Sequence, residues 1–469
     1  MFEIHIILIF LLILSFIDWR KGLFICILVG FFQDPIRKLM PGHSVYYTVL
    51  IVPFILSVLL GLIQYQKGMR INLIFNLYPK IKLTLIIFLL IVAAQSMRTL
   101  IVTNDFNRMG IGLVSYIGPL AGVLLAFNYA LEKRNVTNFL IFYLIIGFLF
   151  VTGVLAEASG YQSPVLGSVG GNHLFIYFPY RLVLQSGLMR AAEISAWHAT
   201  MVAMLSVVIF ALSSPSWRKY IWLGIAGIAL CAIVFTGRRK GFYVFGGFII
   251  IATILAFYSY AKSWKKYIGF VLLGCISILI LFQLITLGDS ALDFNAYTYR
   301  LVHEYANETP FDRFMQMTIN SFQWVILHNG ILGSGAGTGS QGVQHFGGAL
   351  TGLSAEGGVS KVLAELGVPG LVLALLLFFI LIRYIWNIII YVNRQAIYEP
   401  LTIGLSSILI AEAMHFSMAN QAFGDPFIML LMGFFAGFTL AIPLISKEKN
   451  IQQWKHYNAP VLPVLRPTH

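Results

Sequence analysis

Residues 220–260 decide how the chain folds, because a short basic segment, Thr236-Gly-Arg-Arg-Lys-Gly241, lies there between two long apolar runs. The runs cover residues 220–235 and 242–260 and approach the roughly 20 residues that a helix needs to cross a bilayer core. Three adjacent cations beside hydrocarbon are costly unless something binds them. The segment therefore predicts two membrane-spanning helices joined by a basic turn, and the cost of its three charges indicates that the turn binds a ligand.

The rest of the chain shares this apolar character. Of its 469 residues, 59% are hydrophobic and 10% are charged, whereas soluble chains carry about 25% charged residues. The apolar runs are too long and continuous for the alternating strands of a membrane β-barrel. The sequence thus predicts an all-α, polytopic transmembrane helical bundle. Short basic loops account for much of the net charge of +13, so no nucleic-acid partner is expected.

Loops rich in Lys and Arg are expected on the cytoplasmic side, which fixes the direction of each span. With the N-terminus outside, successive spans cross the membrane in opposite directions. Thirteen spans are expected, at residues 4–17, 23–32, 46–63, 83–97, 111–131, 139–155, 194–212, 220–235, 242–260, 267–287, 362–382, 401–418 and 427–445. Every inward turn holds at least two basic residues, and the turn at 236–241 stands out as a basic turn on the outer side. Its three cations, Arg238, Arg239 and Lys240, are therefore the leading functional candidates.

Four regions follow from this arrangement. Residues 1–287 hold the first ten spans with an outer loop at about 157–193, residues 288–360 form a large outer loop, residues 361–446 hold the last three spans, and residues 447–469 form a cytoplasmic tail. The first outer loop ends in Arg190, Glu193 and His198, which the helical repeat places near one helix end. The second holds Arg300, His303, Asp312, Arg313, His345 and Glu356.

Several arginines at an outer surface suit a lipid-linked phosphate or diphosphate, because Arg stays charged and its fork matches phosphate oxygens. Arg190, Arg238, Arg239 and Lys240 are expected to bind such a diphosphate and to stabilise it as a leaving group. The outer loops show no pair of carboxylates of the DxD kind, so neither a metal ion nor another cofactor is expected.

Glycosyl transfer also needs a base for the acceptor hydroxyl. Glu193, His198, His345 and Glu356 are the candidate catalytic residues. The acceptor glycan is expected to contact Arg300, Arg313 and Tyr299, with further stacking rings at Tyr177, Tyr180, Tyr297 and Trp324. The glycine-rich residues 333–339 lack the Lys-Ser/Thr of a nucleotide loop and predict a flexible turn that lets the long loop cover a cleft.

Four local stretches resemble the O-antigen polymerase and O-antigen ligase superfamily of bacterial membrane glycosyltransferases. They are Phe235-Thr-Gly-Arg-Arg-Lys-Gly241, Leu188-Met-Arg-Ala-Ala-Glu-Ile-Ser-Ala-Trp-His198, Ile331-Leu-Gly-Ser-Gly-Ala-Gly-Thr338 and Leu363-Ala-Glu-Leu-Gly-Val-Pro-Gly370. The resemblance places Arg239 at the family's motif arginine. It implies a fold of the lipid-dependent (GT-C-like) glycosyltransferase type and a metal-independent enzyme. The expected substrates are undecaprenyl-diphosphate-linked glycans at the periplasmic face of the plasma (inner) membrane.

One departure from the family separates its two activities. The ligases carry a His-Asn pair shortly before the segment at 363–370, where this chain has Ser354-Ala-Glu-Gly-Gly-Val-Ser-Lys361 and no His. This favours a polymerase of O-antigen or exopolysaccharide over a ligase that joins glycan to the lipid A core of lipopolysaccharide or to protein. Chain-length regulator and flippase proteins are then expected partners. The alternative class is a transporter or flippase of lipid-linked oligosaccharide, for which Glu412 and His415 are the membrane-embedded ionisable pair.

Overall fold

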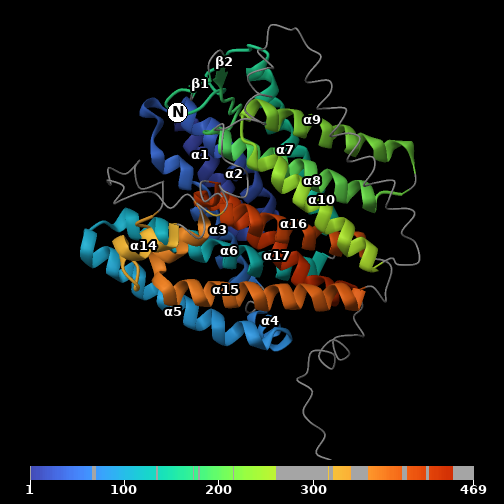
Figure 1. Ribbon diagram of the computed structural model, residues 1–469. Coiled ribbons are helices and arrows are strands. Elements are labelled where there is room, and N and C mark those ends of the chain that lie inside the picture. The colour runs from blue at the N-terminus through green and yellow to red at the C-terminus, as the bar shows by residue number, and fades with distance from the viewer. Residues whose placement is uncertain are drawn as a thin grey trace, which may run out of the picture.

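The computed structural model describes residues 2–65, 70–133, 136–172, 174–177, 180–214, 216–259, 315, 321–339, 357–392, 399–418 and 422–446. Within these ranges the chain is helical apart from loops and one two-stranded hairpin (Figure 1). Nine helices in the described ranges are long and apolar enough to cross a membrane. The prediction of a polytopic helical membrane protein is confirmed.

Helices correspond to all the expected spans except the tenth, residues 267–287, which lies outside the described residues. The long helices are α1 (Phe2–Ile17), α2 (Trp19–Leu39), α3 (Ile51–Tyr65), α5 (Pro79–Thr103), α6 (Phe106–Lys133), α7 (Val136–Ala158), α8 (Ala192–Leu212), α9 (Tyr220–Thr236), α10 (Lys240–Ser259), α15 (Gly358–Val392), α16 (Glu399–Met418) and α17 (Pro426–Ser446). The shorter elements are α4 (Ile71–Leu77), α14 (Ser321–Asn329), β1 (Leu174–Tyr177), β2 (Tyr180–Val183) and the 3-10 turns η1 (Pro41–His43), η2 (Val45–Val49), η3 (Trp217–Lys219) and η6 (Ala422–Gly424).

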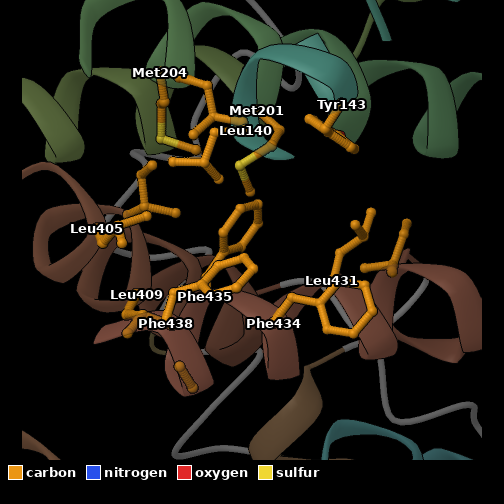
Figure 2. Packing of buried hydrophobic residues seen from close by; sticks show 14 of the residues in the cluster. Leu140, Tyr143, Met201, Met204, Leu405, Leu409, Leu431, Phe434, Phe435 and Phe438 are labelled. Carbon is orange, nitrogen blue, oxygen red and sulfur yellow. The ribbon is translucent and has the colours of Figure 1, made fainter. Parts of the chain in front are cut away.

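Two helices, α8 and α17, form the centre of the bundle. In each, 89% of the most apolar 18-residue stretch is buried inside the protein, whereas in α5 and in α15 only 22% of that stretch is buried. Both central helices are apolar on all faces, which is typical of helices surrounded by other helices. Figure 1 shows α16 and α17 between the group α8–α10 and the pair α5 and α15. Figure 2 shows where side chains from α7, α8, α16 and α17 meet, among them Met201 and Phe435.

The expected second span, residues 23–32, is too short. Helix α2 begins after the N-cap Asp18, whose carboxylate accepts the Arg20 N–H at 3.1 Å, and it continues through Asp34 and Pro35 to Leu39. A charged residue and a proline usually end an apolar run in sequence-based reasoning. Here Asp34 is neutralised by Arg190, which lies 156 positions further along the chain.

The directions of the helices agree with the expected alternation. The C-terminal ends of α2, α7, α9 and α16 meet the N-terminal ends of α8, α10 and α17, and we call this meeting point the arginine end of the bundle. The loop from α7 to α8 folds over this end and carries the hairpin of β1 and β2, in which Leu174 pairs with Val183. The residues of the candidate site lie at this end.

Candidate functional site

The turn between α9 and α10 is tight because two glycines allow it. Gly237 ends α9 in the left-handed conformation (φ 63°), and its N–H donates to the Val234 carbonyl at 2.8 Å. A Cβ on Gly241 would lie 2.7 Å from Thr200 Oγ1, so the start of α10 lies directly against α8. The turn therefore holds the segment Arg238–Lys240 at the arginine end, with all three side chains partly exposed.

Arg238 forms an ion pair with Glu193 in the first turn of α8. Both side chains keep about a quarter of their surface exposed, at 24% and 22%. The pair joins two groups that the sequence predicted separately, the basic turn and the residues before α8. Because Glu193 is bound to a guanidinium, its carboxylate is an anchor for Arg238. Its role as a base stays a prediction.

Arg190 lies deeper and is held by two carboxylates. Its Nη1 donates to Asp34 at 3.0 Å, its Nη2 contacts Asp425 at 2.6 Å, and its backbone N–H also donates to Asp34. Both aspartates are 1% exposed. Burial disfavours the charged form of Arg190, but the two carboxylates outweigh that effect and hold its pKa above the usual range.

These contacts give Arg190 a structural role, while its binding of a diphosphate stays a prediction. Both terminal nitrogens of Arg190 already have a carboxylate partner. Asp425 in addition accepts the Phe427 N–H at 2.7 Å and so caps α17. Arg190 therefore ties α2, the α7–α8 loop and α17 together at the arginine end.

Lys38 performs a similar task for the α7–α8 loop. Its Nζ donates to the carbonyls of Val165, Gly187 and Met189 at 3.0, 2.8 and 2.7 Å. The Glu157 carboxylate accepts the Gly187 N–H at 2.6 Å. Three carbonyl acceptors satisfy an ammonium group that is otherwise buried.

Sequence reasoning missed Lys38, although a signal was present. Arg37 and Lys38 follow the second span on its outer side and so oppose the expected distribution of positive charge, as the turn at 236–241 does. The basic turn is therefore not the sole place with positive charge on the expected outer side, and at Lys38 the explanation is the carbonyls of a folded loop.

His198 is not available to an acceptor, which contradicts its prediction as a base. It is 1% exposed, its Nδ1 is hydrogen-bonded to the Tyr143 hydroxyl at 2.9 Å, and its Nε2 is fully enclosed without a partner among the described residues. The Phe31 and Phe427 rings lie 4.7 and 5.4 Å from its ring centre. Trp197 and His198 begin the second turn of α8, where the helix has already entered the core.

Glu412 and His415 lie near the same end, on the neighbouring helix α16. Glu412 is 0% exposed and its Oε2 accepts the indole N–H of Trp197 at 2.8 Å. The same oxygen lies 3.2 Å from His415 Nδ1. The sequence singled out these two residues only as a possible transport pair; the structure connects them to α8 through Trp197.

The glycine-rich residues 333–339 do not form a flexible turn, so that prediction is wrong. They are docked: the Ser334 N–H donates to the Ala364 carbonyl at 2.7 Å, and the Ala336 carbonyl accepts the Thr99 hydroxyl at 2.7 Å. A Cβ on Gly337 (φ 89°) would lie 2.1 Å from the Arg108 carbonyl oxygen. The glycines therefore permit close contact with α5, α6 and α15.

Glu365 connects this docked segment to α15. It is 0% exposed and accepts the Tyr116 hydroxyl at 2.7 Å and the Gly339 N–H at 3.0 Å. Two residues later Gly367 (φ 71°) bends α15 against Leu332. Two of the four stretches that carry the family resemblance thus contact each other through buried hydrogen bonds.

Several predicted residues have no described position. Tyr297, Tyr299, Arg300, Arg313, His345 and Glu356 lie outside the described residues, and so do His303 and Asp312. Trp324 is described in α14, where its ring stacks on His328 with ring centres 3.9 Å apart. In the described part of the chain, no group of three or more His, Cys, Asp or Glu side chains is arranged to hold a metal ion.

Comparison with known proteins adds no further constraint. No protein-family model matches the sequence, and no curated protein matches it. The functional argument therefore rests on the arginine end itself.

Proposed function

We propose that this protein is a membrane glycosyltransferase that polymerises lipid-linked repeat units into an O-antigen or exopolysaccharide. It would act at the periplasmic face of the bacterial inner membrane. The observation that supports this most is the Arg238–Glu193 pair beside Arg239 and Lys240, at an end where many helices meet. Such a turn offers partly exposed cations that are fixed in position and suited to a diphosphate.

The proposed reaction moves a glycan between two lipid carriers. The acceptor hydroxyl oxygen attacks the anomeric carbon of the donor sugar, and the bond from that carbon to the diphosphate oxygen breaks. Undecaprenyl diphosphate leaves with the bonding electrons, and the hydroxyl proton passes to a base. Arg238 and Arg239 would stabilise the negative charge that builds on the leaving group.

Glu193 has a positioning task in this scheme. Its carboxylate fixes Arg238 while leaving about a quarter of the guanidinium-bearing side chain exposed. The Nε of Arg238 is enclosed without a hydrogen-bond partner in the described part of the chain, so the exposed surface belongs to the rest of the side chain. A fixed cation loses less entropy on binding than a mobile one.

Purified protein in lipid nanodiscs, supplied with lipid-linked repeat units alone, tests the proposal. Wild type should form new glycosidic bonds, and Arg239→Ala should form them at least about 100-fold more slowly because one donor to the leaving group is lost. The matched control is Arg218→Ala, since Arg218 is exposed in η3 at the other end of α9. Normal polymer from Arg239→Ala would overturn the assignment of the basic turn.

A deletion strain separates the related activities. Loss of a polymerase should leave single lipid-linked repeat units, whereas loss of a ligase should leave long lipid-linked polymer. A transporter would form no glycosidic bond in the purified system. Long lipid-linked polymer in the deletion strain, or no glycosidic bond in the purified system, would replace the polymerase proposal.

A further inference from the structure

We propose that His415, oriented by Glu412, is the base that takes the proton from the acceptor hydroxyl. This proposal rests on the proposed function above. It identifies a residue that the sequence did not place in the reaction, and it replaces His198 in that role.

The pair has the geometry of a carboxylate–imidazole dyad. Glu412 Oε2 lies 3.2 Å from His415 Nδ1 and also accepts the Trp197 N–H at 2.8 Å. The Phe423 ring packs edge-on against His415 with ring centres 5.4 Å apart. The carboxylate and the ring together fix the imidazole in one orientation.

The hydrogen bond to Glu412 determines which nitrogen of His415 is free to act. Because Oε2 already accepts from Trp197, it acts as an acceptor, and His415 Nδ1 is the donor that carries the proton. The lone pair then lies on Nε2, which has no hydrogen-bond partner among the described residues. His415 keeps 6% of its surface exposed, whereas Nε2 of His198 is fully enclosed.

The dyad lies close to the basic turn. Glu193 and Trp197 are four residues apart on α8, so they share one face of that helix and are about 6 Å apart along its axis. Glu193 holds Arg238 and Trp197 holds Glu412. The basic turn and the dyad are thus both tied to α8, through residues one helical turn apart.

The start of α15 approaches the dyad from another side. A Cβ on Gly358 would lie 2.5 Å from the Phe416 ring, so α15 begins directly against the end of α16. The beginning of α15 therefore lies next to the end of α16 that carries the dyad. We expect the acceptor sugar to approach His415 from this end of the bundle.

Glu412 is also costly to bury without a function. Its Oε1 is enclosed and has no hydrogen-bond partner in the described part of the chain. An ionisable side chain that is buried in a membrane bundle and only partly satisfied is the kind of group that marks a functional site. The role of Glu412 Oε2 explains why the carboxylate is buried. Beside His415 Nδ1 it stabilises the imidazolium that forms when His415 Nε2 takes a proton.

The proton transfer completes the reaction written above. The acceptor O–H bond breaks as the new carbon–oxygen bond forms, and the proton goes to His415 Nε2. The resulting imidazolium then gives the proton to water, which restores the neutral imidazole for the next transfer.

The test uses the full-length protein in nanodiscs with lipid-linked repeat units. His415→Asn keeps a donor for Glu412 and removes the base, so kcat should fall at least about 100-fold while the KM for the lipid-linked donor changes less than about threefold. His415→Ala should regain activity with added imidazole, which a purely structural role would not produce. The matched control is His5→Asn, because His5 is a histidine at the exposed start of α1.

Glu412 is tested as a positioning residue. Glu412→Gln should lower kcat with little change in KM, and Glu412→Asp should retain more activity than Glu412→Gln because it keeps the carboxylate. Equal loss in both variants, together with a lower thermal midpoint, would show a packing role and overturn the dyad.

The failure of this proposal can be distinguished from failure of the proposed function. If wild type forms no glycosidic bond, the proposed function fails. If wild type is active and His415→Asn keeps its kcat within about threefold, or if imidazole rescues nothing, His415 is not the base and the polymerase proposal stands.

Discussion

At the scale of single residues, ion pairs divide the basic residues of the arginine end into two kinds. Arg190 is enclosed between Asp34 and Asp425, and Lys38 is satisfied by three carbonyls. Arg238 is held by Glu193 and keeps part of its surface exposed. Charge alone made these residues look equivalent in the sequence, but their partners differ. Arg190 and Lys38 join helices and the α7–α8 loop. The turn at 236–241 is the proposed ligand site.

The Arg190→Met variant should lose stability. Two carboxylates that are 1% exposed would remain without their cation, and breaking a buried pair in this way costs about 3–5 kcal/mol. The thermal midpoint of detergent-solubilised protein measures the loss. Arg218→Met should change stability by less than about 0.5 kcal/mol because Arg218 is exposed. If the Arg190→Met protein has the thermal midpoint of wild type but makes no polymer, the result would contradict a structural role and support diphosphate binding by Arg190.

At the scale of elements, the segment 331–339 and the bend of α15 form one docked unit. The Ser334 N–H reaches the Ala364 carbonyl, and Glu365 accepts from Tyr116 and Gly339. Glycines in the left-handed region allow this approach, since Gly333, Gly335, Gly337 and Gly367 all have positive φ. A glycine-rich sequence is therefore compatible with a rigid contact, and glycine content alone did not distinguish a docked segment from a flexible one.

Gly337→Ala should undock this segment. The new Cβ would lie 2.1 Å from the Arg108 carbonyl oxygen, and the left-handed backbone adds about 1–2 kcal/mol of strain. The thermal midpoint should fall and proteolytic cleavage near residue 337 should become faster. Gly246→Ala in α10 is the matched control, because a Cβ added there would meet no neighbouring side chain or helix of the described residues within 4 Å and alanine favours a helix. Equal cleavage of both variants would mean that the docked contacts contribute little.

At the scale of the whole molecule, the direction of each helix decides which side of the membrane the arginine end faces. Positive charge in the opposite loops, such as Arg218 and Lys219 in η3, is expected on the cytoplasmic side, and this expectation would put the arginine end outside. The contacts among α2, α8, α9 and α17 bring together the ends that alternation assigns to one side. The proposed function depends on this orientation, because the donor glycan would be presented on the outer leaflet.

Single cysteines in a variant without Cys26, Cys231 and Cys275 test the orientation. Gln162→Cys lies exposed in the α7–α8 loop, and Ser214→Cys lies exposed between α8 and α9. A membrane-impermeant maleimide should label the first in intact cells and the second only after the inner membrane is permeabilised. The reverse pattern would place the basic turn in the cytoplasm and contradict a periplasmic reaction.

The sequence by itself determined which segments are helices and in which direction they run. Spans such as 194–212 and 427–445 match α8 and α17 closely, because the length of an apolar run and the charge of its flanks are local properties. It also pointed to the turn at 236–241 and to Glu193, which the structure places in contact.

Only the tertiary structure decided what each polar side chain does. The partners of Arg190 lie 156 positions away at Asp34 and on another helix at Asp425, and Glu412 meets Trp197 across 215 positions. No periodicity or local spacing encodes such pairs, because they form when helices distant in sequence pack together. For that reason the sequence included His198 among four candidate bases, whereas in the packed bundle His198 is enclosed and His415 lies beside the Glu412 carboxylate.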